Sequence, residues 1–150
     1  MTHWGIIGLG SIAHHFVKDL ALVPEAKLYG VASRSLEKAN SFASEYLADK
    51  AFGSYEELLR DTLVSVVYIA TPHSSNKEWD IKAMKAGKHV LCEKPLGLDS
   101  LEVVEMIAQA KVSGVFFMEA LWTRFNPSIE AVVNRIHANE IGAIQYLHAD

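Results

Sequence analysis

Short runs of β-forming residues alternate with helical patterns along the chain, and this alternation limits the possible folds more than any other feature. The run over Val64–Ala70 is almost entirely apolar, as expected of a central strand that is buried on both faces. Parallel strands produce such an alternation because each pair is joined by a crossover, usually a helix, that covers one face of the sheet. We therefore expect an α/β fold with a doubly wound, mostly parallel sheet.

The boundaries of the predicted elements follow from side-chain periodicity and from helix-breaking residues such as Pro24 and Gly87. Residues 142–150 alternate in side-chain character and predict a final strand that begins just before the sequence stops. The other strands are expected at 3–8, 27–33, 50–52, 64–70, 89–92 and 115–119, and the helices at 11–22, 35–47, 54–60, 75–86, 99–112 and 127–138.

Composition narrows the class of protein. The 150 residues, 50% hydrophobic and 21% charged, are typical of a soluble globular domain. A net charge of -4 without a basic stripe gives little support to a nucleic-acid partner. Cys92 is the single cysteine, which excludes an internal disulfide and suits the reducing cytoplasm. The sequence has no signal peptide, no membrane-spanning apolar run and no metal-ligand spacing, so we expect a cytoplasmic protein without a metal site.

A glycine-rich turn follows the first predicted strand and precedes the first predicted helix. It reads Gly8-x-Gly10-x-x-Ala13. The first glycine permits the tight turn, the second lets the backbone approach a pyrophosphate, and the small third residue lets helix and strand pack closely. The helix then begins at Ser11 and Ile12, where N–H groups and the helix dipole favour phosphate. Glycine-rich turns are common, but this position in the first βαβ unit predicts a Rossmann-type dinucleotide site.

The end of the second predicted strand bears on the choice between NAD and NADP. NAD-binding chains usually place an acid there to accept hydrogen bonds from the ribose. This chain instead reads "VASRSLEK", and a guanidinium matches a phosphate where a carboxylate would repel it. Ser33, Arg34, Ser35 and Lys38 could therefore hold the 2′-phosphate of NADP, with NAD still possible. The alternative is a solvated charged turn.

Three further strand ends carry polar residues beside aromatic residues or proline: "IATPHSSN", "CEKPLG" and "MEALWTRF". Ligands of doubly wound sheets bind outside the carboxyl ends of the strands. A lone lysine or histidine is usually a solvated or structural residue, but three such strand ends together predict a single site.

These segments, together with the glycine-rich turn, resemble the Gfo/Idh/MocA oxidoreductases. The stretches "ATPHSSN", "AGKHVLCEKP" and "EALWTRFNP" are most similar to the branch that contains dimeric dihydrodiol dehydrogenase and NADP-dependent xylose dehydrogenase. The resemblance covers essentially the whole chain and implies a dinucleotide-dependent oxidoreductase.

The resemblance also implies roles for individual residues. Lys94 would lie near the nicotinamide and the reacting carbon–oxygen bond, and Pro95 would follow a cis peptide bond that aims Lys94 into the cleft. Where relatives commonly carry "TPNxxH", His73 replaces the Asn and Asn76 replaces the His, which leaves the hydrogen bonding of this stretch open. The residues that the resemblance places at the cofactor are Thr71, Pro72, His73, Asn76, Glu93, Lys94, Trp122 and Arg124.

Lys94 also suits the chemistry without the family. Oxidation of an alcohol by hydride transfer needs a group that takes a proton, and reduction needs one that gives it. A lysine amine is ordinarily too basic for this task at neutral pH, but partial burial beside a cationic nicotinamide favours its neutral form, and Glu93 could oppose that effect. Lys94 could instead anchor a phosphate or pair with Glu93. In the same way, Trp122 could be a core residue and Arg124 a surface charge, and we expect Cys92 to be a small buried hydrophobe.

The resemblance implies a second domain. Family members are typically about twice this length, and their second α/β domain usually supplies substrate contacts, a further catalytic His, Tyr or Asp, and a dimer surface. We expect a dinucleotide-binding domain over 1–125, and over 126–150 a connecting helix and the start of a substrate and dimerisation domain. On this interpretation the chain is a fragment of a homo-oligomeric protein and is inactive by itself.

The predicted function is NADP-dependent hydride transfer between nicotinamide and a sugar, a cyclic polyol or a trans-dihydrodiol. The alternative is a regulatory protein that senses the nucleotide without catalysis. Lys94 favours the enzyme, because a sensor needs no proton-transfer group beside the cofactor.

Overall fold

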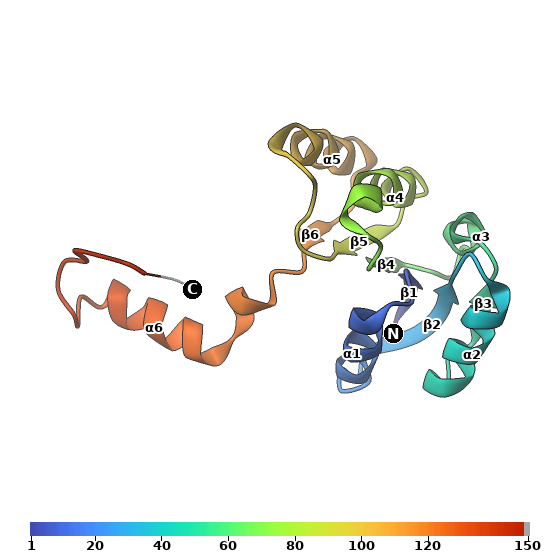
Figure 1. The fold of residues 1–150 in the computed structure, drawn as a ribbon, viewed down its shortest axis with the longest axis horizontal. Coiled ribbons are helices and arrows are strands. Elements are labelled where there is room, and N and C mark those ends of the chain that lie inside the picture. Colours follow the sequence, from blue (N-terminus) through green and yellow to red (C-terminus); the bar gives the residue numbers. More distant parts are fainter. Residues whose placement is uncertain (149–150) are drawn as a thin grey trace. The chain divides into compact units, whose positions relative to one another are not determined.

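Strands and helices alternate along residues 1–148, the part of the chain that the computed structural model describes (Figure 1). The chain divides into two compact units, Met1–Ala120 and a second that begins at Leu121. The strands are β1 (Thr2–Ile7), β2 (Ala26–Ala32), β3 (Lys50–Phe52), β4 (Val66–Ile69), β5 (His89–Cys92) and β6 (Phe117–Glu119). The helices are α1 (Ser11–Leu20), α2 (Leu36–Tyr46), α3 (Tyr55–Arg60), α4 (His73–Lys85), α5 (Ser100–Ser113), the 3₁₀ helix η1 (Trp122–Phe125) and α6 (Pro127–His137).

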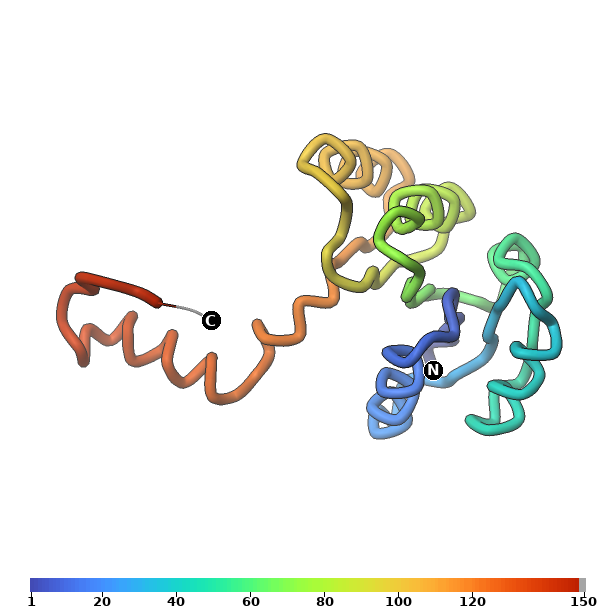
Figure 2. Tube along the Cα trace, in the orientation of Figure 1, coloured from blue at the N-terminus to red at the C-terminus, as the bar shows by residue number. Residues whose placement is uncertain are grey.

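The first unit contains one six-stranded sheet in the order β3-β2-β1-β4-β5-β6, and every neighbouring pair is parallel. The chain first builds the sheet outward from β1 to β3 and then returns to β4 on the other side of β1, a path that can be followed along the Cα trace (Figure 2). The strand order therefore reverses between β1 and β4, which is where doubly wound sheets bind their ligands. The predicted Rossmann-type fold is confirmed.

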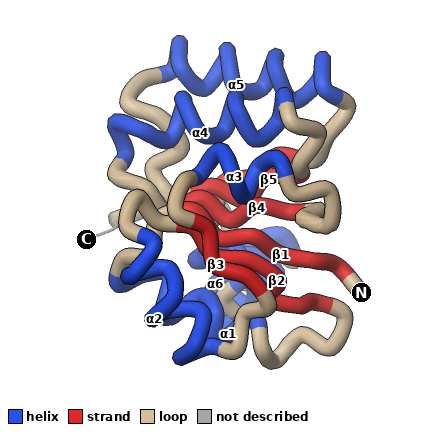
Figure 3. Tube along the Cα trace, turned by 90° about the vertical axis from the view of Figure 1, so that its right-hand side faces the viewer, coloured by secondary structure: helices blue, strands red, loops and turns tan. Residues whose placement is uncertain are grey.

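Helices cover both faces of this sheet (Figure 3). Ala13 and Val17 of α1 and Phe42 of α2 pack on one face, while α3, α4 and α5 pack on the other. Both faces of the central strands are therefore buried, which explains why their sequences are almost continuously apolar. Within residues 1–148, no helix has both the length and the apolar character required to span a membrane.

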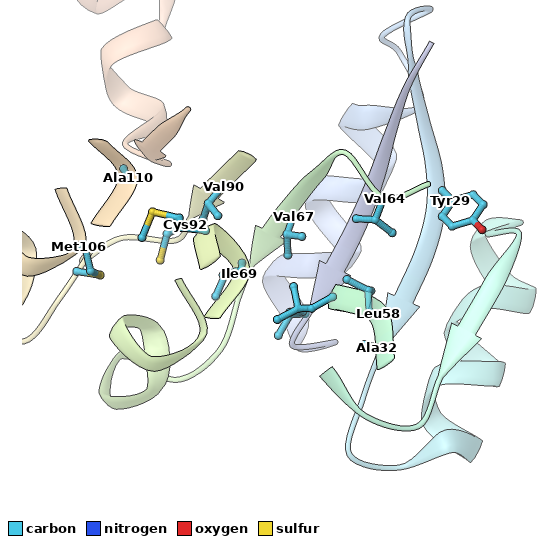
Figure 4. Packing of buried hydrophobic residues seen from close by; sticks show 14 residues of the cluster. Tyr29, Ala32, Leu58, Val64, Val67, Ile69, Val90, Cys92, Met106 and Ala110 are labelled. Carbon is cyan, nitrogen blue, oxygen red and sulfur yellow. The ribbon is translucent and has the colours of Figure 1, made fainter. Parts of the chain in front are cut away.

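The larger hydrophobic cluster connects the centre of the sheet to its later strands (Figure 4). Ile69 and Val90 lie fully buried beneath α4, and Met106 of α5 closes the cluster. The Cys92 side chain points into the same cluster and is fully buried, so the prediction that it is a small buried hydrophobe is confirmed. This packing fixes the carboxyl ends of β4 and β5, which carry the site.

Helix starts follow the signals in the sequence. Ser54 caps α3 by accepting a hydrogen bond from the Glu57 N–H at 3.2 Å, and the Glu57 carboxylate accepts from the Gly53 N–H at 3.2 Å. Asp99 caps α5 in the same manner, accepting from the Glu102 N–H at 2.9 Å. The expected helices are present, and their ends lie within two residues of the predicted positions.

One lysine is buried for a structural reason. Lys88, just before β5, is 7% exposed, and its ammonium donates to the carbonyl oxygens of Asp61 at 2.7 Å and Val64 at 2.9 Å. Burial lowers the pKa of Lys88. The two hydrogen bonds hold the loop between α3 and β4 against the start of β5, so this lysine aligns two strands that lead to the site.

The second unit differs from the sequence prediction in one respect. No β-strand forms over residues 142–148, and residues 149 and 150 of the predicted strand lie outside the described part. A strand gains stability from a neighbour, and the described part of this unit holds no strand for it to join. The helix expected at 127–138 is present as α6, with Asn126 as its N-cap.

Candidate active site

A hollow lies at the carboxyl ends of the central strands, where the strand order reverses. Its walls come from the first turn of α1, the end of β4, the start of α4 and the segment after β5. All of its lining residues except Ala70 were predicted to bind the cofactor, so the structure brings together residues that are far apart in the sequence. The lining residues are Ile12, Ala70, Thr71, His73, Glu93 and Lys94.

The glycine-rich turn forms one side of this region. Gly8 has φ +89°, and a Cβ atom there would lie 2.5 Å from the Ala70 carbonyl oxygen, so only glycine fits between β1 and β4. A Cβ on Gly10 would meet nothing within 4 Å, which leaves open space above the turn. Gly10 is the N-cap of α1 and no side chain caps this helix, which begins at Ser11. The turn therefore fits a pyrophosphate, since it offers helix N–H groups and room for close approach.

The end of β2 presents the residues predicted to select the cofactor. Ser33 is buried, and its hydroxyl accepts a hydrogen bond from the Ser35 N–H at 3.3 Å. Ser35 in turn caps α2 by accepting from the Lys38 N–H at 3.3 Å. The side chains of Arg34 and Lys38 are exposed, and neither has an ion-pair partner within residues 1–148. Arg34 and Lys38 therefore lie beside a turn that the hydrogen bonds of Ser33 and Ser35 stabilise, and among the described residues their charges are unpaired.

Lys94 follows β5 with its side chain exposed, while hydrogen bonds hold the residues on either side of it. The peptide bond between Lys94 and Pro95 is cis, as the resemblance implied. The Glu93 carboxylate accepts from the Tyr68 hydroxyl at 2.5 Å and from the Lys94 backbone N–H at 3.2 Å. Burial, followed by this contact, raises the pKa of Tyr68, so the phenol keeps its proton and remains the donor. Glu93 therefore orders the backbone, and within the described chain it forms no ion pair with the Lys94 ammonium.

Asn76 lies on the first turn of α4, which begins two residues earlier than predicted. It is fully buried. Its amide nitrogen donates to the carbonyl oxygens of Glu93 at 3.4 Å and Pro95 at 3.1 Å, and its amide oxygen accepts from the Thr71 hydroxyl at 2.9 Å. Asn76, one of the two residues that depart from the common pattern, therefore binds the backbone of residues 93–96, the Lys94 segment, and does not line the hollow.

Glu119 at the end of β6 holds the other side of the same segment. Its carboxylate accepts from the Leu96 N–H at 2.9 Å. Neither Glu119 nor Tyr68 was predicted as a site residue. The signal for Glu119 was its place at a polar strand end, and the signal for Tyr68 was a hydroxyl on an otherwise apolar central strand.

Comparison with known proteins places the chain in a family. Residues 2–121 match the Gfo/Idh/MocA description "Oxidoreductase family, NAD-binding Rossmann fold". The chain belongs to this family. The match covers the whole sheet of the first unit, including the glycine-rich turn and the Lys94 segment.

Three known proteins illustrate what this chain is similar to. The trans-1,2-dihydrobenzene-1,2-diol dehydrogenases of Bos taurus and Mus musculus are 42% and 44% identical to 98% of this chain, which spans 44% and 45% of their lengths. The 3-ketoreductase KijD10 from Actinomadura kijaniata, solved in complex with NADP, is 30% identical with a TM-score of 0.90 over 96% of this chain and 46% of that protein. The chain thus spans less than half the length of each of these relatives.

This family member also buries a carboxyl group close to the site. Asp80 of α4 is fully buried, and neither carboxylate oxygen has a hydrogen-bond partner within residues 1–148. Its polar neighbour is Cys92, whose thiol donates to the Glu93 carbonyl oxygen at 3.5 Å. Burial raises the pKa of Asp80 to about 7, and the neighbouring thiol opposes this only partly. Burial, with Asp80 adding to it, also raises the pKa of Cys92, so this thiol is not an activated nucleophile.

Pro72 and two residues of the second unit complete the set of predicted site residues. Pro72 is exposed and is the N-cap of α4. Trp122 and Arg124 lie on η1, in the second unit, and their place at the nicotinamide stays a prediction. No group of three His, Cys, Asp or Glu side chains is arranged to hold a metal ion in the part of the chain that is described.

Proposed function

We propose that the protein to which this chain belongs is an NADP-dependent oxidoreductase, and that residues 1–125 form its cofactor-binding domain. The observation that carries this proposal is the convergence of Ile12, Thr71, His73 and Lys94 on one hollow at the switch point of the sheet. A structural lysine would not need this position at the mouth of a dinucleotide cleft.

The dinucleotide would extend along the carboxyl ends of the strands. Gly8 and Gly10 leave room for the pyrophosphate, and the N–H groups of Ser11 and Ile12 would bind it at the start of α1. Arg34 and Lys38, with Ser33, would hold the 2′-phosphate at the end of β2. The NADP that accompanies KijD10 supports the same choice of cofactor.

The chemistry at the other end of the cofactor falls to Lys94. NADP supplies the acceptor or donor of hydride when it is bound. Lys94 would take the proton of the substrate hydroxyl as the carbon loses hydride, and would return that proton in the opposite direction. The backbone bonds made by Glu93 hold Lys94 while leaving its ammonium unpaired among the described residues.

The names of the relatives support the substrate class. Two are dehydrogenases of a trans-dihydrodiol and one is a 3-ketoreductase, and dehydrogenation of an alcohol carbon and reduction of a ketone are opposite directions of hydride transfer. We propose a sugar, a cyclic polyol or a trans-dihydrodiol as substrate. We further propose that residues 126–150 lead into a second domain that completes the pocket and a homo-oligomer interface.

A substrate screen tests the function. The full-length protein is assayed with NADP and a panel of aldoses, inositols and trans-dihydrodiols, with NADPH formation measured by absorbance. We expect turnover with at least one class. Tight NADP binding without turnover on any of them, or on the matching ketones with NADPH, would instead support the nucleotide-sensing alternative.

Cofactor preference tests the role of Arg34. NADPH should bind more tightly than NADH in a fluorescence titration, because the 2′-phosphate gains charge-assisted hydrogen bonds. Changing Arg34 to Asp should shift the preference toward NADH by about 1 to 3 kcal/mol. Arg60→Asp, the same charge change at an exposed arginine on α3, serves as the control and should leave the preference unaltered. Equal affinities for NADPH and NADH in the unmodified protein would contradict the proposal that Arg34 holds the 2′-phosphate.

A further inference from the structure

The four residues from Glu93 to Leu96 receive side-chain hydrogen bonds from three separate elements. Tyr68 of β4 binds the Glu93 carboxylate, Asn76 of α4 binds two carbonyl oxygens, and Glu119 of β6 binds the Leu96 N–H. We propose that Asn76 is the positioning residue of the reaction, which holds Lys94 in place by binding the backbone on both sides of it. This inference rests on the proposed function, in which Lys94 transfers the proton.

Asn76 is matched to this task by its chemistry. A side-chain amide has two N–H donors and one carbonyl acceptor. The carbonyl oxygens of Glu93 and Pro95 can only accept, so the amide nitrogen must face them, and this leaves the amide oxygen for the Thr71 hydroxyl. Every kind of polar group on the side chain is therefore used, as expected of a buried amide.

The two carbonyl oxygens that Asn76 binds lie directly before and directly after Lys94 in the chain. A shift of the α4 turn would therefore move the Lys94 backbone itself. Misplacement of a catalytic group by about 1 Å can cost on the order of 100-fold in rate. Asn76 is fully buried and reaches neither solvent nor the surface of the hollow, so its influence on the reaction would pass through the groups it binds, the Lys94 segment and the Thr71 hydroxyl.

Substitutions at this position form a graded series. Asp is isosteric with Asn, but its carboxylate cannot donate and would face two carbonyl oxygens. Neutral His has one donor and one acceptor, so it could bind one of the two carbonyl oxygens and the Thr71 hydroxyl. The expected order of kcat is therefore Asn, then His, then Asp.

The experiment uses the full-length protein and compares Asn76→Asp and Asn76→His with the unmodified protein. We expect kcat to fall by about 10- to 100-fold in Asn76→Asp and by less in Asn76→His. The dissociation constant for NADPH should change by less than about 3-fold, because the buried Asn76 amide does not itself line the hollow. Met84→Ala is the matched control: it opens a cavity at a fully buried residue of the same helix that takes no part in the side-chain hydrogen bonds of this segment. An equal loss of kcat per folded molecule in Met84→Ala, or an unchanged kcat in Asn76→Asp, would overturn the proposal.

A second measurement does not depend on turnover. Hydrogen exchange at the Leu96 amide should accelerate by about 10-fold or more in Asn76→His, while the amides of β1 and β4 stay protected. Lys94→Ala, measured in parallel, separates the two proposals. If that variant keeps full turnover, the proton-transfer role fails, and exchange at Leu96 alone decides whether Asn76 holds the segment. If Lys94→Ala is inactive but both Asn76 variants keep kcat and exchange unchanged, only the positioning role fails.

Discussion

Replacing Lys94 with alanine is expected to lower kcat of the full-length protein by about 10²- to 10⁴-fold, the range that general acid–base groups supply. The loss should fall mainly on kcat, because the Lys94 side chain is exposed at the mouth of the hollow and its hydrogen-bonded backbone is shared with alanine. The dissociation constant for NADPH should change little, since the proposed phosphate contacts come from the glycine-rich turn and the end of β2.

Steady-state kinetics and a fluorescence titration of NADPH check this result. Lys94→Arg is the matched variant, because it keeps the positive charge but cannot release a proton near neutral pH. Both variants should be impaired if Lys94 transfers the proton. Recovery by Arg alone would show that only the positive charge is needed, and full activity of Lys94→Ala would exclude the catalytic role.

Most of the fold could be predicted because its signals are local. The apolar run at Val66–Ile69, the serine cap of α3 and the glycines that end helices each depend on a few neighbouring residues. The strand predicted over 142–150 is absent from residues 142–148, where no such local signal is sufficient. Alternating side chains permit a strand, but a partner strand is required to form one.

The candidate site was predictable to the extent that topology brings strand ends together. The glycine-rich turn indicated Ile12, while the strand ends of the doubly wound order together with the family resemblance indicated Thr71, His73 and Lys94, and all four line the hollow. The supporting hydrogen bonds of Tyr68 and Asn76 could not be predicted, because they depend on which side chain faces which across neighbouring elements. For Asn76 the sequence indicated only a departure from the common pattern, and the structure supplies its partners.

A second large effect is expected at Asp80, where the protein buries a carboxyl group without a hydrogen-bond partner among the described residues. An ionised carboxylate in such a place has lost its hydration without compensation, so the protonated form is favoured. This raises the pKa of Asp80 in the folded state to about 7, compared with an ordinary value of 3.8. The folded protein therefore holds a proton that the unfolded chain releases across the interval between these two values.

The sign of the pH dependence follows from this difference. Where the folded state binds more protons than the unfolded state, the free energy of unfolding falls as pH rises. The contribution of Asp80 is complete below about pH 4, declines through the interval up to about pH 7, and is lost above it. The whole loss is on the order of 4 kcal/mol, at about 1.4 kcal/mol for each pKa unit.

Asp80→Asn should remove this decline. Urea unfolding of the unmodified protein and the variant between pH 5 and pH 8 gives the difference in their free energies of unfolding, in which contributions from other titrating groups cancel. We expect that difference to shift in favour of the Asp80→Asn variant by a few kcal/mol across the range, whatever constant cost the unpaired amide adds. Cys92→Ala should keep the decline, because burial rather than the thiol is the main cause of the raised pKa of Asp80. Parallel curves for Asp80→Asn and the unmodified protein would mean that the carboxylate is solvated or paired in the folded state. A change in slope confined to Asp80→Asn would instead show that ionisation of Asp80 destabilises the folded protein as the pH rises through neutrality.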